Sequence, residues 1–536
     1  MKIDNKGTSV FTLILILILL TASLCISGCT GSAGKEKVAT EESTSLPIQK
    51  TSGDKNLTMG VMWAINNIDP LVCEETNELV TEYLVKCNND FSLKPYLATS
   101  WKAVDNNTWE FELKKNVSFS NGDPFTAEDV KFSLEWDIKN NKKLDQLTKI
   151  GSINVLDNHT LQIKTKEPNP VLPETLHYSK AVIFSPKSID KNGEMGVPIG
   201  TGPFKIESYD DKVYTLVFVK NDYWWGGKPR LDKITFKTIE DPNTRAMAIE
   251  SGEIDYTLDV PYNEVDRLDA LPGISVEKFN TANEYILETN ANNTALSDKG
   301  VRQALSYGID REDMAKNVLF GVGRPAIGIF LPEMHWVNSD LKPYNYDPEK
   351  AKRLLTEAGW VDSNGDGIRE KDGKTLKLGL LTYPNRPGLP PIGETMAAQY
   401  KNLGIDIKYE VMEWGGISDR LKSGDWNLLL STMGVSNVAD PSYVFNDMYI
   451  TGGDGNRGGY SNPKLDAMIT EANGIADLKK RYAKFNEIQA FVHEEQPIIP
   501  VCYYGCAVAK KDSVKGLVFD TTVHGFFLNP EIYIES

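Results

Sequence analysis

The chain contains 536 residues, 41% hydrophobic and 25% charged, which is the composition of a globular protein too long for one ordinary domain. Its formal net charge of −16 argues against nucleic acid and anionic lipid as partners. The charge is compatible with a cationic ligand, but the simpler explanation is that it keeps the protein soluble.

The N-terminus has the pattern of a secretory leader. Lys2 and Lys6 precede an apolar run over residues 10–20, and small residues follow. The stretch Ile26-Ser27-Gly28-Cys29 resembles a lipobox, which implies that residues 1–28 are a lipoprotein signal peptide and that Cys29 carries a lipid. The alternative is an uncleaved anchor, because the run and its flank reach the roughly 20 residues that span a bilayer. In both cases we expect the body of the protein outside the cytoplasm, tethered to the membrane.

The body begins after a polar segment. Residues 29–56 are rich in Gly, Ser, Thr, Lys and Glu, which predicts a flexible tether. Residues 57–63 are the first predicted strand, and residues 75–83 are a predicted helix.

The region over residues 93–136 predicts a strand, a turn and a capped helix. Every second residue from Trp109 to Leu113 is apolar, which is the period of a half-buried strand. Thr126 and Asp129 have the spacing of a capping box at a helix start. These features indicate an ordered protein of mixed α and β structure.

Later stretches continue the mixed pattern. Gly200 and Gly202 predict unusual backbone dihedrals where the chain crosses between lobes. Asp241 caps a predicted helix that lies between two strands, as in a βαβ unit. Asp347 caps another helix, and a further helix is predicted over about residues 478–493.

Four cysteines lie in the body of the chain: Cys73, Cys87, Cys502 and Cys506. The first two bracket a predicted helix and could close a loop in an oxidising compartment. The last two are four residues apart in a predicted strand, hence ~13 Å apart at ~3.3 Å per residue, which is too far for a disulfide. A metal site that adds His493 or His524 to this pair is conceivable, but plain buried cysteines are the simpler interpretation.

Several of these stretches resemble one protein family. The order of Pro95, Ser100-Trp101 and Asn121-Gly122-Asp123-Pro124-Phe125 is similar to the signature of the large extracytoplasmic solute-binding proteins of ABC importers, the oligopeptide, dipeptide and nickel family. IGTGPF at 199–204 and VRQALSYGIDRE at 301–312 extend the likeness, which covers about residue 57 to the C-terminus.

The resemblance implies an α/β protein with the type 2 periplasmic-binding-protein fold, two main lobes with a hinge and an inserted third lobe. Lobe I would then be discontinuous and comprise residues 57–90, 196–285 and 505–536. Lobe II would be the insertion, residues 91–195, and lobe III would comprise residues 286–504.

The enzyme motifs in the sequence are incomplete. Gly373-Lys374-Thr375 ends like a phosphate-binding loop, but Ile368 stands where its first glycine is required. His493-Glu494 lacks the second histidine of a zinc protease, because residue 497 is Pro497. We therefore expect no enzyme, and a secreted metal-dependent hydrolase is the rival from a different class.

One loop resembles half of a calcium site. Asp362, Asn364 and Asp366 occupy positions 1, 3 and 5 of such a loop, and Glu370 is ninth. Position 12 is Gly373 rather than the bidentate glutamate. The pattern therefore allows a structural calcium ion and no other cofactor, and the alternative is a tight polar hairpin without metal.

Binding clefts combine aromatic walls with a few polar groups, and candidates for both lie where predicted strands end. The candidate ligand-binding residues are Trp63, Trp136, Tyr383, Arg386, Trp414, Met433, Asp440, Tyr443 and Tyr504. Any single aromatic residue among them is more often structural than functional.

Two of the candidates carry a specific resemblance. Asp440 lies in a stretch similar to the family segment in which an aspartate pairs with the α-amino group of a peptide, and Ser442 stands where some nickel binders have a histidine. Arg386 lies in a stretch that resembles an Arg-Pro-x-Leu-Pro segment of the nickel branch and could fork onto a carboxylate. The alternative is that Arg386 pairs with a nearby acid.

The resemblance implies a monomeric, lipid-anchored binding protein that captures peptides and delivers them to an ABC permease and ATPase complex. The alternative within the family is nickel, or another transition metal, carried by a small chelator.

Overall fold

The computed structural model describes residues 55–518 and 528–535. The predicted signal peptide, Cys29, nearly all of the tether and His524 lie outside the described residues. Among the described residues, no helix is both long enough and apolar enough to cross a membrane.

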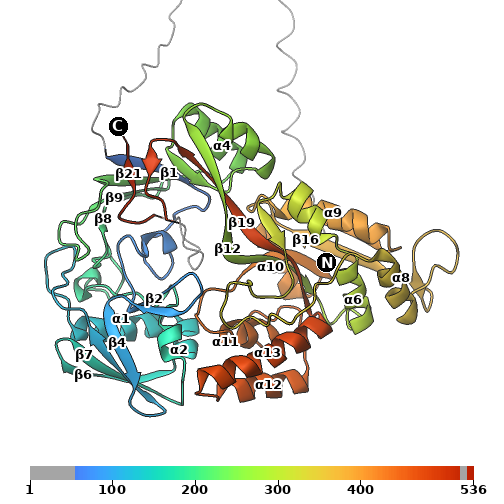
Figure 1. Cartoon of the computed structure of the whole chain (residues 1–536), viewed down its shortest axis with the longest axis horizontal. Coiled ribbons are helices and arrows are strands. Elements are labelled where there is room, and N and C mark those ends of the chain that lie inside the picture. Colours follow the sequence, from blue (N-terminus) through green and yellow to red (C-terminus); the bar gives the residue numbers. More distant parts are fainter. Residues whose placement is uncertain (1–54, 519–527, 536) are drawn as a thin grey trace, which may run out of the picture. The chain divides into compact units, whose positions relative to one another are not determined.

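The largest sheet has eleven strands (Figure 1). Its order is β17 (Asp406–Val411), β16 (Lys377–Thr382), β18 (Leu428–Gly434), β12 (Ile274–Thr289), β19 (Ile498–Lys511), β11 (Tyr256–Leu258), β1 (Asn56–Val61), β10 (Lys233–Thr238), β9 (Thr215–Lys220) and β8 (Phe204–Asp210), and β13 (Gly323–Pro325) also pairs with β19. The long strands β12 and β19 lie side by side and antiparallel, so they join β18, β16 and β17 on one side of the sheet to β11, β1, β10, β9 and β8 on the other.

Smaller sheets lie outside this order. Lobe II holds a four-stranded antiparallel sheet of β4 (Ala98–Ala103), β5 (Thr108–Leu113), β7 (Thr160–Thr165) and β6 (Ile150–Asp157). Two-stranded hairpins pair β2 (Val85–Cys87) with β3 (Leu93–Pro95), β14 (Glu370–Lys371) with β15 (Lys374–Thr375), and β20 (Val514–Lys515) with β21 (Tyr533–Ile534).

Helices fill the connections between the strands (Figure 1). They are α1 (Ala127–Asn140), α2 (Lys142–Thr148), α3 (Leu172–Thr175), α4 (Pro242–Ser251), α5 (Val265–Asp269), α6 (Lys299–Tyr307), α7 (Arg311–Asp313), α8 (Pro348–Glu357), α9 (Leu389–Lys401), α10 (Trp414–Ser423), α11 (Ser442–Val444), α12 (Pro463–Asn473) and α13 (Leu478–Glu495).

The buried apolar side chains form separate clusters. The largest runs through the large sheet, from Leu57 in β1 to Leu380 in β16. A second lies on lobe III around Phe445 and Phe485, and a third lies around Phe111. This third cluster consists mostly of residues 97–183 and also includes Leu84 and Val85, which precede the predicted lobe II. The lobe boundaries themselves stay a prediction.

Local predictions based on caps and periodicity are confirmed. β5 covers the alternating residues 108–113, and the side chains of Thr126 and Asp129 form the capping box of α1. Asp241 caps α4, where its carboxylate accepts from Thr244 N at 2.7 Å, and Asp347 caps α8 in the same way. The last predicted helix is α13.

The predicted helix over residues 75–83 is wrong. Only Glu74–Thr76 form a turn of 3₁₀ helix. The backbone that follows pairs with distant segments, because the carbonyls of Leu79 and Val80 accept from Phe204 N and Gly202 N at 2.8 and 2.9 Å. These tertiary hydrogen bonds replace the helical ones and override the local preference.

The prediction that Gly200 and Gly202 adopt unusual backbone dihedrals is also wrong. Neither glycine has a positive φ. A Cβ atom on Gly200 would lie 1.8 Å from Val80 O, and one on Gly202 would lie 2.6 Å from Leu79 O. The two glycines are required because two backbone segments pack against each other here.

Candidate functional site

Arg386 lies in the loop between β16 and α9 and is 7% exposed. Its Nη1 donates to Asp259 Oδ2 at 3.4 Å and to Tyr504 Oη at 3.5 Å. The guanidinium carbon lies 5.4 Å from the ring centres of both Trp63 and Tyr504, within the range of cation–π attraction. The structure therefore brings together three of the predicted residues, and we call Trp63, Asp259, Arg386 and Tyr504 the Arg386 group.

Asp259 is the member of this group that the sequence did not single out. It follows β11, is 1% exposed and has a left-handed φ of 51°. Its Oδ2 accepts the hydroxyl of Tyr504 at 2.5 Å, and its backbone carbonyl accepts Arg245 Nη2 at 2.8 Å. The signal for it in the sequence is an acidic residue directly after a buried strand.

Two members of this group, Arg386 and Tyr504, both keep their protons near neutral pH. Burial lowers the pKa of Arg386, but Tyr504 and Asp259 more than offset this effect, so the net shift is upward. Burial, together with the Asp259 carboxylate, raises the pKa of Tyr504 well above its ordinary value. Tyr504 is therefore a neutral hydrogen-bond donor, and Arg386 is a permanent cation that can bind a carboxylate with a fork of N–H groups.

Tyr383, which follows β16, and Trp414, the first residue of α10, form a separate aromatic pair. Their rings pack edge to face with centres 5.3 Å apart, and the Tyr383 hydroxyl lies 3.2 Å from Thr432 Oγ1. Trp414 is 44% exposed and Trp63 is 38% exposed. Both indoles present apolar surface with a polar N–H, which suits contact with a ligand.

Asp440 and Tyr443 form a different group. Asp440 is 1% exposed, and its Oδ1 and Oδ2 accept from Nη2 and Nε of Arg481 at 2.7 and 2.9 Å. Tyr443 accepts from Asn437, and its ring centre lies 6.2 Å from that of Tyr178 in lobe II. In this structure a guanidinium holds the place where a ligand's ammonium was expected, so that role of Asp440 stays a prediction.

Met433 and Trp136 lie apart from the Arg386 group. Met433 is paired in register with Glu284 and belongs to the lobe III cluster around Phe445, whereas Tyr504 belongs to the large cluster. Trp136 packs on Phe184 in lobe II, with ring centres 5.4 Å apart. We assign core packing to both side chains.

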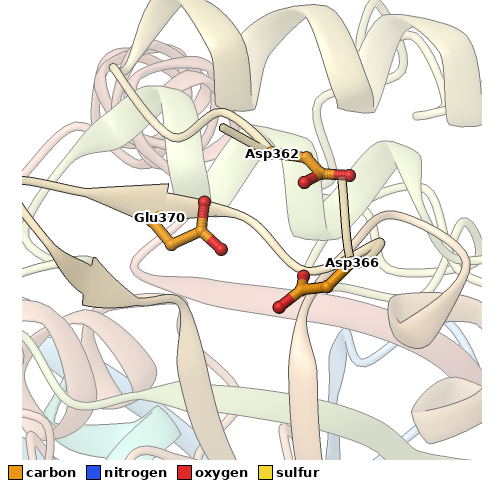
Figure 2. A group of neighbouring side chains, drawn as sticks. All are labelled: Asp362, Asp366 and Glu370. Carbon is orange, nitrogen blue, oxygen red and sulfur yellow. The ribbon is translucent and has the colours of Figure 1, made fainter. Parts of the chain in front are cut away.

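The predicted calcium loop gathers three carboxylates (Figure 2). Ligand atoms of Asp362, Asp366 and Glu370 all lie within 4.8 Å of one another, and within residues 55–518 and 528–535 they are the only such group of His, Cys, Asp or Glu. The amide nitrogen of Asn364 donates to both Asp366 and Glu370 at 3.0 Å, so this side chain has to turn over to offer oxygen to a cation. Cys502 and Cys506 lie in β19, as predicted, and are buried.

We predict that calcium stabilises this loop without affecting solute binding. Millimolar calcium is expected to raise the melting temperature by a few degrees relative to excess EGTA, because a ligand that binds only the native state adds to its stability. Asp362→Asn should abolish the shift in differential scanning fluorimetry. Equal melting temperatures in calcium and EGTA would show that the loop is a polar hairpin without metal.

The family model for bacterial extracellular solute-binding proteins, family 5, matches residues 92–456. The nickel-binding periplasmic protein of Escherichia coli is 30% identical over 462 residues, 82% of this chain and 87% of that protein. The oligopeptide-binding protein AppA of Bacillus subtilis is 27% identical over 530 residues, 94% of this chain and 95% of that protein. The crystal structure of NikA from Staphylococcus aureus in complex with Ni(L-His)2 superposes with a TM-score of 0.77 at 28% identity and covers 90% of this chain and all of that one.

These relatives are binding proteins rather than enzymes, and the structural match confirms the predicted α/β solute-binding fold. The family model covers more than half of the chain. The chain belongs to the bacterial extracellular solute-binding proteins of family 5.

Proposed function

We propose that this protein captures a carboxylate-bearing chelate of nickel outside the membrane and delivers it to the permease of an ABC importer. The observation that carries the proposal is Arg386, a permanent cation whose guanidinium carbon lies 5.4 Å from the ring centres of Trp63 and Tyr504 and whose buried acidic partner is Asp259. A planar guanidinium next to aromatic faces suits a carboxylate on a small organic molecule. The lobes then close over the solute by a hinge motion.

The ion pair of the second group bears on the peptide alternative. Both oxygens of Asp440 accept from Arg481, so a peptide's α-ammonium would have to displace that guanidinium, just as a carboxylate on Arg386 would have to share it with Asp259. The chelate in the Staphylococcus aureus structure contains two L-histidine molecules, each of which carries a carboxylate. The Escherichia coli relative is also a nickel-binding protein.

A peptide is the second candidate. The Bacillus subtilis oligopeptide-binding protein matches 94% of this chain. The terminal carboxylate of a peptide has the same charge and shape as that of an amino acid, so Arg386 suits it equally. The two candidates differ at the other end of the ligand, where a peptide presents an ammonium and a chelate presents a metal.

Isothermal titration calorimetry tests the proposal with three probes: nickel with two equivalents of L-histidine, L-histidine alone, and trialanine. We expect heat only from the nickel complex, because the metal fixes the geometry of its ligands. Native mass spectrometry and elemental analysis of the freshly purified protein give an independent reading. Binding of trialanine alone would favour the peptide candidate, and binding of L-histidine without metal would remove nickel from the proposal.

The proposal places the protein on the outer face of the cytoplasmic membrane as a lipid-anchored monomer. Its support is the leader pattern and the lipobox-like residues before Cys29. Cys29→Ser is expected to move the protein from the membrane fraction to the soluble fraction in its own cells. Membrane retention of that variant would point to an uncleaved anchor.

A further inference from the structure

Lobe II and lobe III meet along a seam that lies apart from the Arg386 group. The carbonyl of Glu174 in α3 accepts from Ala439 N at 3.4 Å, and the rings of Tyr178 and Tyr443 lie 6.2 Å apart. Lys143 of α2 forms an ion pair with Asp447. A cavity of about 370 Å³ interrupts the seam and is lined from both sides, so the two surfaces are only partly packed. Such a seam can separate when the lobes open.

The surroundings of the Glu174 side chain disfavour its ionised form. Its Oε2 is buried and has no hydrogen-bond partner in the part of the chain that the structure describes. The adjacent cation, Arg481, already uses four of its five N–H donors, two on Asp440 and two on the carbonyls of Ala472 and Asn473. An ionised Glu174 would thus be a second carboxylate beside a cation that Asp440 has neutralised. Burial raises the pKa of Glu174 to about 8; Asp440 adds to this effect, and a backbone hydrogen bond and Arg481 only partly oppose it.

We propose that closure of lobe II onto lobe III takes up one proton at Glu174, so that the protein holds its solute more tightly as the pH falls. This inference rests on the proposed capture of a solute between lobes that close. It adds a regulation of that capture by the acidity outside the cell.

The direction follows from the two pKa values of Glu174. With the lobes apart the carboxyl group meets water and has its ordinary pKa of 4.5, and in the closed protein its pKa is about 8. Between these limits closure binds a proton, so the ratio of closed to open protein falls by up to about tenfold for each unit of rising pH. Below the lower limit the proton is present in both forms and the dependence disappears.

Other charged or titratable groups around Glu174 do not reproduce this behaviour. From lobe III the facing groups are Asp440, Arg481 and Tyr482. Burial raises the pKa of Tyr482, and the pKa of Arg481 shifts upward because Asp440 outweighs burial, so both keep their protons. His177 follows three residues later in the chain, with its ring against Tyr83. A comparison with a Glu174 variant at the same pH cancels any contribution from this histidine.

Glu174→Gln is the test, because the amide has the shape of the protonated acid and cannot ionise. The dissociation constant of nickel with L-histidine is measured by calorimetry at about pH 6, 7 and 8 for the wild type, for E174Q and for E167Q, whose carboxylate is on the surface with Lys149. We expect the ratio of the wild-type constant to that of E174Q to rise with pH, by up to about tenfold for each unit. The ratio of wild type to E167Q should stay constant. Parallel pH profiles for the wild type and E174Q would overturn the inference.

A second measurement separates this inference from the identity of the solute. Small-angle X-ray scattering of the protein without added ligand is recorded over the same pH range. We expect the radius of gyration of the wild type to increase with pH and that of E174Q to change less. If the nickel complex fails to bind, the proposed solute is wrong, and scattering alone decides the inference: identical pH profiles of wild type and E174Q overturn it.

Discussion

Arg386→Gln is expected to weaken binding of the nickel–L-histidine complex by about 100-fold or more. A carboxylate on the guanidinium makes two charge-assisted hydrogen bonds, each contributing about 1.5–3 kcal/mol, and glutamine replaces them with a neutral amide. Calorimetry of the purified protein measures the effect directly. Arg386→Lys should retain part of the affinity, because lysine keeps the positive charge but cannot make the two parallel hydrogen bonds of a guanidinium to a carboxylate.

The control for this prediction separates binding from folding. Arg386→Gln leaves the buried Asp259 without its cation, which by itself destabilises the protein. The double variant Arg386→Gln with Asp259→Asn removes both charges, so we expect it to regain stability while binding stays lost. Arg353→Gln, an exposed arginine on α8, should bind like the wild type. An affinity of Arg386→Gln within about threefold of the wild type would show that the solute does not meet this residue.

Arg481→Leu is expected to reduce the free energy of unfolding by about 3–5 kcal/mol, because it leaves Asp440 as an unpaired buried charge. The double variant Arg481→Leu with Asp440→Leu should recover most of that loss, since apolar residues can replace a buried ion pair at little cost. Urea unfolding followed by circular dichroism provides the measurement. Lys479→Ala, on the exposed start of the same helix, should change stability by less than about 0.5 kcal/mol.

The same variants test the predicted role of Asp440. If Arg481 blocks an ammonium site, then Arg481→Leu should acquire trialanine binding, provided that the protein is still folded at the temperature of the titration. Asp440→Asn in a background that also carries Glu174→Gln should bind nickel–L-histidine like Glu174→Gln alone, because the amide at position 174 removes the effect of Asp440 on that carboxyl group. Loss of nickel binding in this double variant would instead place the solute at the seam between lobes II and III.

The sequence alone was sufficient to predict the elements that are specified by residues close together in the chain. A capping residue and the helix that it starts lie within one turn of the chain, so the sequence is enough to predict the helix start. The caps are Thr126 with Asp129 for α1, Asp241 for α4 and Asp347 for α8. The alternating residues of β5 are local in the same sense. The family resemblance, carried by short stretches in fixed order, was confirmed by the comparisons.

Contacts between residues far apart in the chain could not be read from the sequence. The backbone of residues 79–82 pairs with residues 183–204 instead of forming a helix, and the helical preference of that stretch contributes less than those tertiary hydrogen bonds. Asp259 approaches Arg386 across 127 residues, and Arg481 reaches Asp440 across 41. No pattern of neighbouring residues predicts which acidic side chain will pair with which basic side chain.

For the candidate site, the sequence by itself determined the kinds of residue: an arginine before Pro387, an aspartate before Pro441, and aromatic residues where strands end. Only the tertiary structure decided that Arg386 lies with Trp63, Asp259 and Tyr504 and that Asp440 is neutralised by Arg481. The physical reason is that a charge is buried only with a partner, and the order of strands in the large sheet, rather than distance along the chain, decides which partner is within reach.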